Sequence, residues 1–232
     1  MDNLSLGKQI EAKPSPFSGF KVKRNRYVVV AVVVLLAIVI LLYVFINANN
    51  SQVTNITPST NQLIDSYKSK IPELESKVEL NPNDSTAVHD LAIALYATGD
   101  ITGAKEKYLI ESNLNPSNPV TFNNLGNAYR DTEDNNKAIE AYKKSIELDK
   151  TQVNAYLNLA NLYIYTTNQF DLGINTLRAA LESNPNNSEV MYMQIGSSYL
   201  VQNKKDLAKD AYNKVLEFNP NNSGAINALK NL

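Results

Sequence analysis

The sequence contains no cysteine, no tryptophan and a single histidine, His89, among its 232 residues. Without cysteine there can be no disulfide, zinc–thiolate site, iron–sulfur cluster or thiol nucleophile. One histidine argues against a histidine-rich metal site and against a Ser-His-Asp triad. Glycine and proline are scarce, at 8 and 9 residues, so the chain is neither collagen-like nor broadly of low complexity. These absences predict a protein without a cofactor.

Catalytic signatures are missing as well. The sequence has no GxGxxG or GxxxxGK[ST] phosphate loop, no HExxH metal motif and no GxSxG nucleophile turn. Neighbouring acids such as Glu133 and Asp134 are expected on solvated turns and helix starts, where they would not act as an acid–base pair. We therefore expect no enzymatic activity.

Charge is nearly balanced overall, with 22 Lys and Arg residues against 23 Asp and Glu residues. This balance gives no reason to expect a nucleic-acid partner. It conceals an uneven distribution, because residues 1–26 hold six basic and only two acidic residues. We expect this segment to be a disordered basic tail.

Residues 27–46 form one uncharged run without proline or glycine, YVVVAVVVLLAIVILLYVFI. As a helix this run would be about 30 Å long, the thickness of the hydrocarbon layer of a bilayer. The basic segment KVKRNR precedes it, and the next charged residue is Asp65. Because basic residues favour the cytoplasmic side, the sequence predicts a single-pass membrane protein with a cytoplasmic N-terminus and an extracytoplasmic remainder. The alternative is a cleavable signal peptide, whose apolar region is usually shorter.

The rest of the chain is a tandem repeat. Asn-Pro pairs, replaced once by Asp-Lys, recur with their second members at positions 82, 116, 150, 185 and 220. The spacing of 34 or 35 residues indicates stacked helix–turn–helix units. Each Asn-Pro pair can end a helix, because asparagine tolerates the left-handed region and proline cannot continue the helix. We place the extra residues of the longer units in the turns at 166–169 and 185–189.

Large and small apolar residues recur within each unit at helical spacing. The second unit shows the pattern most clearly, with Phe122, Leu125, Gly126, Tyr129, Ala138, Tyr142 and Ser145. In this pattern the chain resembles the tetratricopeptide repeat (TPR) family, which implies an all-α helical solenoid of about four helix–turn–helix repeats. Glu111 departs from the pattern, because the family has a small residue at its position.

The predicted organisation has nine parts. We expect a basic cytoplasmic tail at 1–26, a transmembrane helix at 27–46, a polar linker at 47–59 and an N-terminal capping helix region at 60–84, interrupted at Pro72. Four repeats follow at 85–118, 119–152, 153–187 and 188–222, and a short capping helix at 223–232 ends the chain. Capping helices are expected because the terminal units of a stack would otherwise expose an apolar face.

The resemblance also implies a concave surface, formed by the first helices, that grips an extended peptide. Amide side chains recur on these helices and can pair with a peptide backbone without reading its sequence. The predicted peptide groove contains Asp90, Asn123, Asn124, Asn127, Arg130, Asn154, Asn158, Asn161 and Gln194. His89 is expected to be an exposed polar residue of the same groove. The abundance of asparagine, at 32 residues, leaves a chance origin of this amide row open.

These observations predict a membrane-anchored scaffold or assembly factor that binds extended segments of other proteins, with the lipid bilayer as a second partner through residues 27–46. The alternative is an accessory subunit of an envelope machine, for secretion, cell-wall or cytochrome assembly, that docks through its convex surface. The two hypotheses differ in which face of the solenoid is needed.

Overall fold

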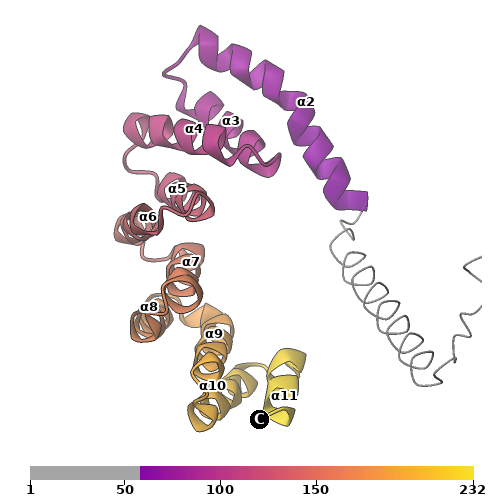
Figure 1. Cartoon of the computed structure of the whole chain (residues 1–232), viewed down its shortest axis with the longest axis vertical. Helices are drawn as coiled ribbons and strands as arrows, with labels where there is room; N and C mark the ends of the chain where they lie inside the picture. The colour runs from indigo at the N-terminus through magenta and orange to yellow at the C-terminus, as the bar shows by residue number, and fades with distance from the viewer. Residues whose placement is uncertain (1–57) are drawn as a thin grey trace, which may run out of the picture. The chain divides into compact units, whose positions relative to one another are not determined.

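Ten α-helices follow one another without a strand in residues 58–232, the part of the chain that this computed structural model describes (Figure 1). The predicted basic tail, the predicted membrane helix and residues 47–57 of the predicted linker lie outside the described residues. Within residues 58–232, no helix is both long enough and apolar enough to cross a bilayer.

Eight of the helices form four successive pairs. The first helices of the pairs are α3 (Ser85–Ala97), α5 (Pro119–Asp131), α7 (Val153–Asn161) and α9 (Ser188–Val201). The second helices are α4 (Ile101–Leu114), α6 (Asn135–Leu148), α8 (Phe170–Ser183) and α10 (Lys205–Phe218). One helix precedes the pairs, α2 (Pro58–Leu80), and one follows them, α11 (Ser223–Lys230).

Polar side chains and left-handed residues define the ends of these helices. Asp100 and Asp134 accept hydrogen bonds from backbone N–H groups in the first turns of α4 and α6, as expected for residues that precede a helix. The turn inside each pair uses one residue with positive φ, and these residues are Gly99, Glu133, Asn168 and Asn203. Glycine and asparagine suit this conformation, whereas Glu133 adopts it against its preference.

The two helices of a pair meet where a small residue faces a large ring. A Cβ atom added to Gly126 on α5 would lie 2.5 Å from Cε1 of Tyr142 on α6. The fourth pair repeats this arrangement, with 2.6 Å between a Cβ at Gly196 and Cε1 of Tyr212. The rings of Tyr142 and Tyr212 are buried. Glycine therefore allows the first and second helices to approach closely.

The structure differs from the expectation at Pro72. α2 runs through this residue without interruption. Proline removes one backbone donor, but its fixed φ is compatible with a helix. The carbonyl left without that donor belongs to Lys68, an exposed residue, so water can satisfy it. The proline therefore does not divide the helix.

The extra residue of the third unit also lies elsewhere than expected. It is taken up in the last turn of the first helix, which widens into a π-helix at Leu162–Thr166. The N–H of Thr167 donates to the carbonyl of Leu162, five residues earlier, at 3.0 Å. Such a turn holds one more residue than an α-helical turn, so the connection that follows keeps its usual length. A short 3₁₀ turn, Pro185–Asn187, lies at the second predicted position.

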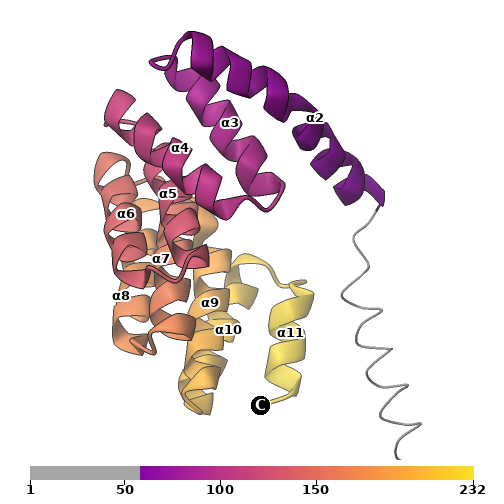
Figure 2. The same cartoon turned by 45° about the horizontal axis from the view of Figure 1, so that its top comes forward.

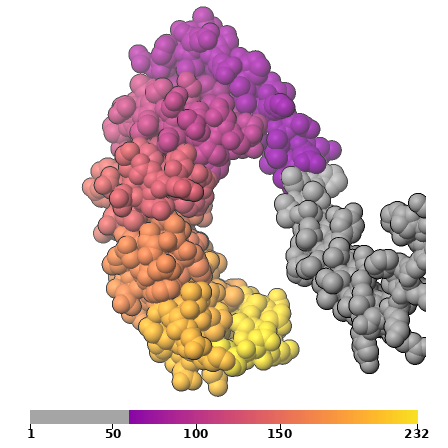
Figure 3. All heavy atoms as spheres, in the orientation of Figure 1, coloured from indigo at the N-terminus to yellow at the C-terminus, as the bar shows by residue number. Residues whose placement is uncertain are grey.

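The pairs stack in chain order into a curved solenoid. α2 packs against α3 at one end and α11 packs against α10 at the other, while each pair contacts the next (Figures 1 and 2). The first helices lie along the inner side of the curve, and the space-filling view shows this side hollowed (Figure 3). The solenoid therefore offers a concave surface built from α3, α5, α7 and α9.

Candidate peptide-binding groove

Amide side chains from α5 and α7 form a connected cluster on the concave surface. The Nδ2 group of Asn158 on α7 donates to Oδ1 of Asn123 and to Oδ1 of Asn127, both on α5 and both at 3.0 Å. Asn123 in turn donates to Oδ1 of Asn124 at 3.4 Å. The hydroxyl group of Tyr142 on α6 donates to Oδ1 of Asn127 at 2.8 Å. We call Asn123, Asn124, Asn127 and Asn158 the amide cluster.

The amide cluster links two neighbouring repeats. Asn123 is only 9% exposed, so its oxygen depends on Asn158 for a hydrogen bond. Asn124, Asn127 and Asn158 are partly exposed on the concave side. Part of the predicted row is therefore structural, and part of it remains accessible to a ligand.

Asn161 continues the row but is not paired in the same way. Its Oδ1 is buried and has no hydrogen-bond partner within residues 58–232. In the second and fourth pairs, the equivalent residues Asn127 and Ser197 contact a tyrosine hydroxyl group of the second helix. In the third pair, Leu177 occupies the position of that tyrosine and has no hydroxyl group. The missing partner of Asn161 follows from this replacement.

Arg130 on α5 is paired with a neighbouring acid, which neutralises its charge. Its Nε donates to Asp131 at 2.8 Å, and Tyr96 on α3 donates to the same carboxylate. Burial opposes ionisation of Asp131, but the hydrogen bonds from Arg130 and Tyr96 outweigh it and lower its pKa. Burial, together with the hydrogen bond to Asp131, raises the pKa of Tyr96 to about 12. Asp131 therefore joins the first two repeats through Tyr96, and Arg130 is not a free cation for a ligand.

Three other predicted groove residues have no place in the amide cluster. Asp90 on α3 is exposed and lines a cavity of about 220 Å³ together with Tyr67 and Lys70 of α2. Asn154 on α7 is exposed, and Gln194 on α9 is partly exposed. The structure thus brings Asn123, Asn124, Asn127 and Asn158 into direct contact, and leaves Asp90, Asn154 and Gln194 outside that cluster.

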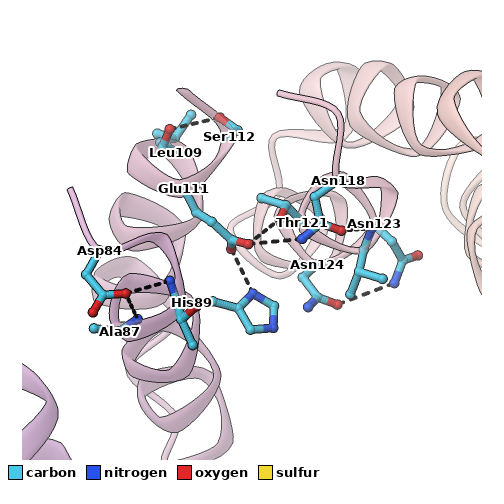
Figure 4. Close-up of polar contacts among 12 residues, drawn as sticks. Asp84, Ala87, His89, Leu109, Glu111, Ser112, Asn118, Thr121, Asn123 and Asn124 are labelled. Atoms are coloured by element: carbon cyan, nitrogen blue, oxygen red, sulfur yellow. Dashed lines mark hydrogen bonds and ion pairs between the residues drawn. The ribbon is translucent and has the colours of Figure 1, made fainter. Parts of the chain in front are cut away.

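The expectation for His89 as an exposed polar residue is wrong. Its side chain is 23% exposed, and its Nδ1 lies 2.8 Å from Oε2 of Glu111 on α4 (Figure 4). Glu111 is 1% exposed and also accepts hydrogen bonds from the side chains of Asn118 and Thr121, at the start of α5. Glu111 therefore connects α3, α4 and α5. We call His89, Glu111, Asn118 and Thr121 the Glu111 network.

The Glu111 network could have been suspected from the sequence. Glu111 replaces a small residue, and a carboxylate at such a position must find hydrogen-bond donors nearby. The only histidine of the chain lies in the facing helix of the same unit. The hydrogen bond to Glu111 raises the pKa of His89, although burial acts in the opposite direction.

The accessible side chains decide which ligands the concave surface could contact. Within residues 58–232, no group of three His, Cys, Asp or Glu side chains could hold a metal ion. The accessible groups at the centre are neutral amides, which exchange hydrogen bonds with neutral polar ligands such as a peptide backbone.

Family models match most of the predicted repeats. A model described as TPR repeat matches residues 126–164. A second model, described as tetratricopeptide repeat, matches residues 153–187 and 190–222. The first predicted unit, 85–118, lies outside these matches. No curated protein sequence matches the chain.

Solved structures show the same fold. The crystal structure of MamA matches with a TM-score of 0.61 and 20% identity, over 67% of this chain and 90% of that one. YrrB, described as a TPR protein with an unusual peptide-binding site, matches with a TM-score of 0.59 and 17% identity, over 75% of this chain and 89% of that one. A thermophilic TPR protein of Thermus thermophilus matches with a TM-score of 0.54 and 19% identity, over 74% and 94%. At these identities the likeness establishes the fold alone.

Proposed function

This chain carries tetratricopeptide repeats, and from that premise we propose that it is a scaffold that holds extended segments of other proteins in its concave groove. The observation that carries the proposal is the amide cluster, which lies on the inner side of the stack and is partly exposed. The description of YrrB as a peptide-binding TPR protein supports this reading by analogy of fold.

The chemistry of the groove supports a ligand recognised through its backbone. Arg130 is paired with Asp131, so the centre of the groove presents neutral amides and no unpaired cation. A row of neutral donors and acceptors suits the N–H and C=O groups of an extended chain, whatever its side chains are. We therefore propose a partner segment bound with little dependence on its sequence.

We further propose, from the sequence alone, that residues 27–46 anchor the chain in a membrane. The basic segment before this run favours a cytoplasmic N-terminus and places the repeats on the extracytoplasmic side.

Site-specific photocrosslinking tests the proposed function. A photoreactive residue would replace Asp90 or Asn154, which are exposed on first helices, in chains expressed in native membranes. Lys143 and Asp210, exposed on second helices, provide matched positions on the other face. We expect the groove positions to capture a defined partner segment that mass spectrometry identifies repeatedly.

Capture from the second helices alone would contradict groove binding. It would favour the alternative of an accessory subunit of an envelope machine that docks through its convex surface. The two hypotheses are therefore separated by one set of four labelled chains.

Protease accessibility tests the proposed orientation. Protease added outside intact cells or spheroplasts should digest residues 60–232 and spare the basic tail, because the tail lies in the cytoplasm. Antibodies or tags at each end would report the surviving fragment. Full protection of residues 60–232 would contradict an extracytoplasmic solenoid.

A further inference from the structure

The turns that precede α3, α5, α7, α9 and α11 follow one another along one edge of the solenoid. These turns comprise residues 81–84, 115–118, 149–152, 184–187 and 219–222. Side-chain hydrogen bonds connect neighbouring turns. Nδ2 of Asn184 donates to the carbonyl of Lys150 at 3.2 Å. Oε1 of Glu189, at the start of α9, accepts from Asn219 and Asn222 at 3.2 and 2.6 Å. We call these five turns the turn edge.

Three turns of the turn edge carry an Asn-x-Ser sequence. The asparagines are Asn83, Asn186 and Asn221, and the serine two positions later begins the next helix in each case. Many other asparagines of residues 58–232 lie within helices, and none of those has Ser or Thr at the second following position. Asn-x-Ser/Thr is the acceptor sequence of N-linked glycosylation, provided that x is not proline and the site is exposed. The acceptor sequence and the exposed turns therefore coincide.

The carboxamide groups of these three asparagines are available for modification. All three residues are exposed, and within residues 58–232 none of the three side chains makes a hydrogen bond through its Nδ2 group. Other asparagines of the same turns are engaged in contacts. Asn184 is 8% exposed and donates to a backbone carbonyl, and Asn222 accepts from the N–H of Ala225. The acceptor sequence thus falls on asparagines that can carry a large group without losing a contact.

We propose that Asn83, Asn186 and Asn221 are N-linked glycosylation sites. Nδ2 of the asparagine forms a bond to C1 of a sugar that a membrane lipid carries on a phosphate group. The bond between C1 and the phosphate oxygen breaks, the phosphate leaves with the electron pair, and Nδ2 releases one proton. The co-reactants are a lipid-linked oligosaccharide and a membrane-bound transferase. The inference rests on the proposed extracytoplasmic location of the repeats, because exported chains are the ones that receive such sugars, and it does not depend on groove binding.

The serine of each acceptor sequence indicates when the site is modified. The sequence requires a hydroxyl group, so the transferase must reach the serine as well as the asparagine. Ser188 is 7% exposed, and its hydroxyl group donates to the carbonyl of Pro185 at 2.7 Å. Ser223 is exposed at the start of α11. Asn186 is therefore modified before α9 packs into the stack, whereas Asn221 remains an acceptor in the folded chain.

The sequence supplies two internal controls. Asn115, on the same turn edge, has a serine at the second following position, but Pro116 lies between them and blocks transfer. Asn3 also has a serine at that position, and it belongs to the basic tail that we propose to be cytoplasmic. Neither asparagine should carry a sugar.

Peptide mass spectrometry tests the assignment. The full chain would be purified from native membranes and digested with trypsin, which places the three acceptors on separate peptides, 78–105, 179–204 and 215–230. We expect the same sugar mass on all three peptides, and none on the peptides that contain Asn3 and Asn115. Ser223→Ala should remove the added mass from Asn221 alone, and Ser223→Thr should restore it, because either hydroxyl group completes the acceptor sequence.

A second experiment tests the order of modification. The full chain would be made in a host without N-linked glycosylation, folded in detergent micelles and incubated with native membranes, which supply the transferase and the lipid-linked sugar. We expect Asn221 to gain the sugar mass and Asn186 to remain unmodified. Equal modification of the two sites in the folded chain would contradict the order.

Three unmodified acceptor peptides in the chain from native membranes would overturn the inference. If the protease experiment nevertheless shows that the repeats lie outside, the proposed orientation stands. A sugar on Asn3 with unmodified turns would overturn the orientation and the inference together. A sugar on Asn115 would show that the acceptor sequence does not direct the modification, which would also overturn the inference.

Discussion

At the scale of single residues, asparagines that look alike in the sequence have different surroundings. Asn158 donates to two oxygens of the preceding repeat, whereas the oxygen of Asn161 is buried without a partner within residues 58–232. Each residue sits on the groove side of α7, so spacing alone cannot separate them. Asn158 finds its partners on α5, whereas Asn161 lacks one because Leu177 of the second helix takes the place of a tyrosine.

This difference predicts opposite effects of two alanine substitutions. Asn158→Ala should lower the free energy of unfolding by about 1–3 kcal/mol, because Oδ1 of Asn123 loses its donor in a buried site. Asn161→Ala should leave stability unchanged or raise it, because a buried unpaired oxygen is removed. Urea unfolding of the two variants measures the change in the free energy of unfolding for each. A larger loss for Asn161→Ala would contradict the hydrogen bonds described here.

The His89–Glu111 pair predicts a dependence of stability on pH. Glu111 on α4 and Asp90 on α3 face His89 as anionic groups, and Tyr108 on α4 packs edge-on to its ring. Because the pKa of His89 is raised in the folded state, its contribution is fully present below the unfolded value of 6.5. That contribution is lost as pH rises through the folded pKa.

Because the chain has a single histidine, the titration of its imidazole can be followed by NMR without resonance assignment. We expect the imidazole proton signals of the full chain to titrate above pH 6.5, and the thermal midpoint to fall as pH increases through that range. Glu111→Gln should lower the pKa of His89, and His89→Gln should flatten this part of the stability profile. A midpoint that rises from about pH 6 to about pH 8 in the unmodified chain would contradict the pair.

At the scale of helices, close approach within a pair is the feature that the sequence predicts best. The repeat pattern includes Gly126 as a small residue at helical spacing, and the structure places it against the buried ring of Tyr142. Gly126→Leu should therefore cost about 1–3 kcal/mol of stability through overpacking. Gly224→Ala is the control, because its Cβ would lie 3.2 Å from flexible side-chain atoms of Asn222 and Met193. Equal melting of the two variants would show that the predicted register is wrong.

Other features of the helices could not be predicted from the pattern. The third unit holds one extra residue, and the repeat spacing does not say where. A longer turn and a π-helix could accommodate it equally well. Only the backbone bond from Thr167 to Leu162 distinguishes them. Pro72 similarly suggests a break, and the exposure of Lys68 explains why the helix continues. In both cases the outcome depends on which hydrogen-bond partners the backbone N–H and C=O groups have.

At the scale of the whole molecule, the repeat spacing predicts the all-α solenoid. It does not predict the polar contacts between neighbouring repeats. The contacts between neighbouring repeats depend on pairs such as Tyr96–Asp131 and Glu111–Thr121, each of which joins residues of two successive units. Signature positions report apolar packing, both within a unit and between neighbouring units. Polar contacts between units depend on departures from the signature, of which Glu111 is the clearest.

The central claim is that the amide cluster binds the backbone of a partner. The most direct measurement is the affinity of the full chain for the partner segment identified by groove crosslinking. We expect the double substitution Asn124→Ala and Asn127→Ala to weaken binding by about 1–3 kcal/mol, a factor of roughly 5–150. Lys143→Ala with Asp210→Ala, on the second helices, should leave it unchanged. Full affinity of the asparagine variant, with its native helicity intact, would contradict the claim.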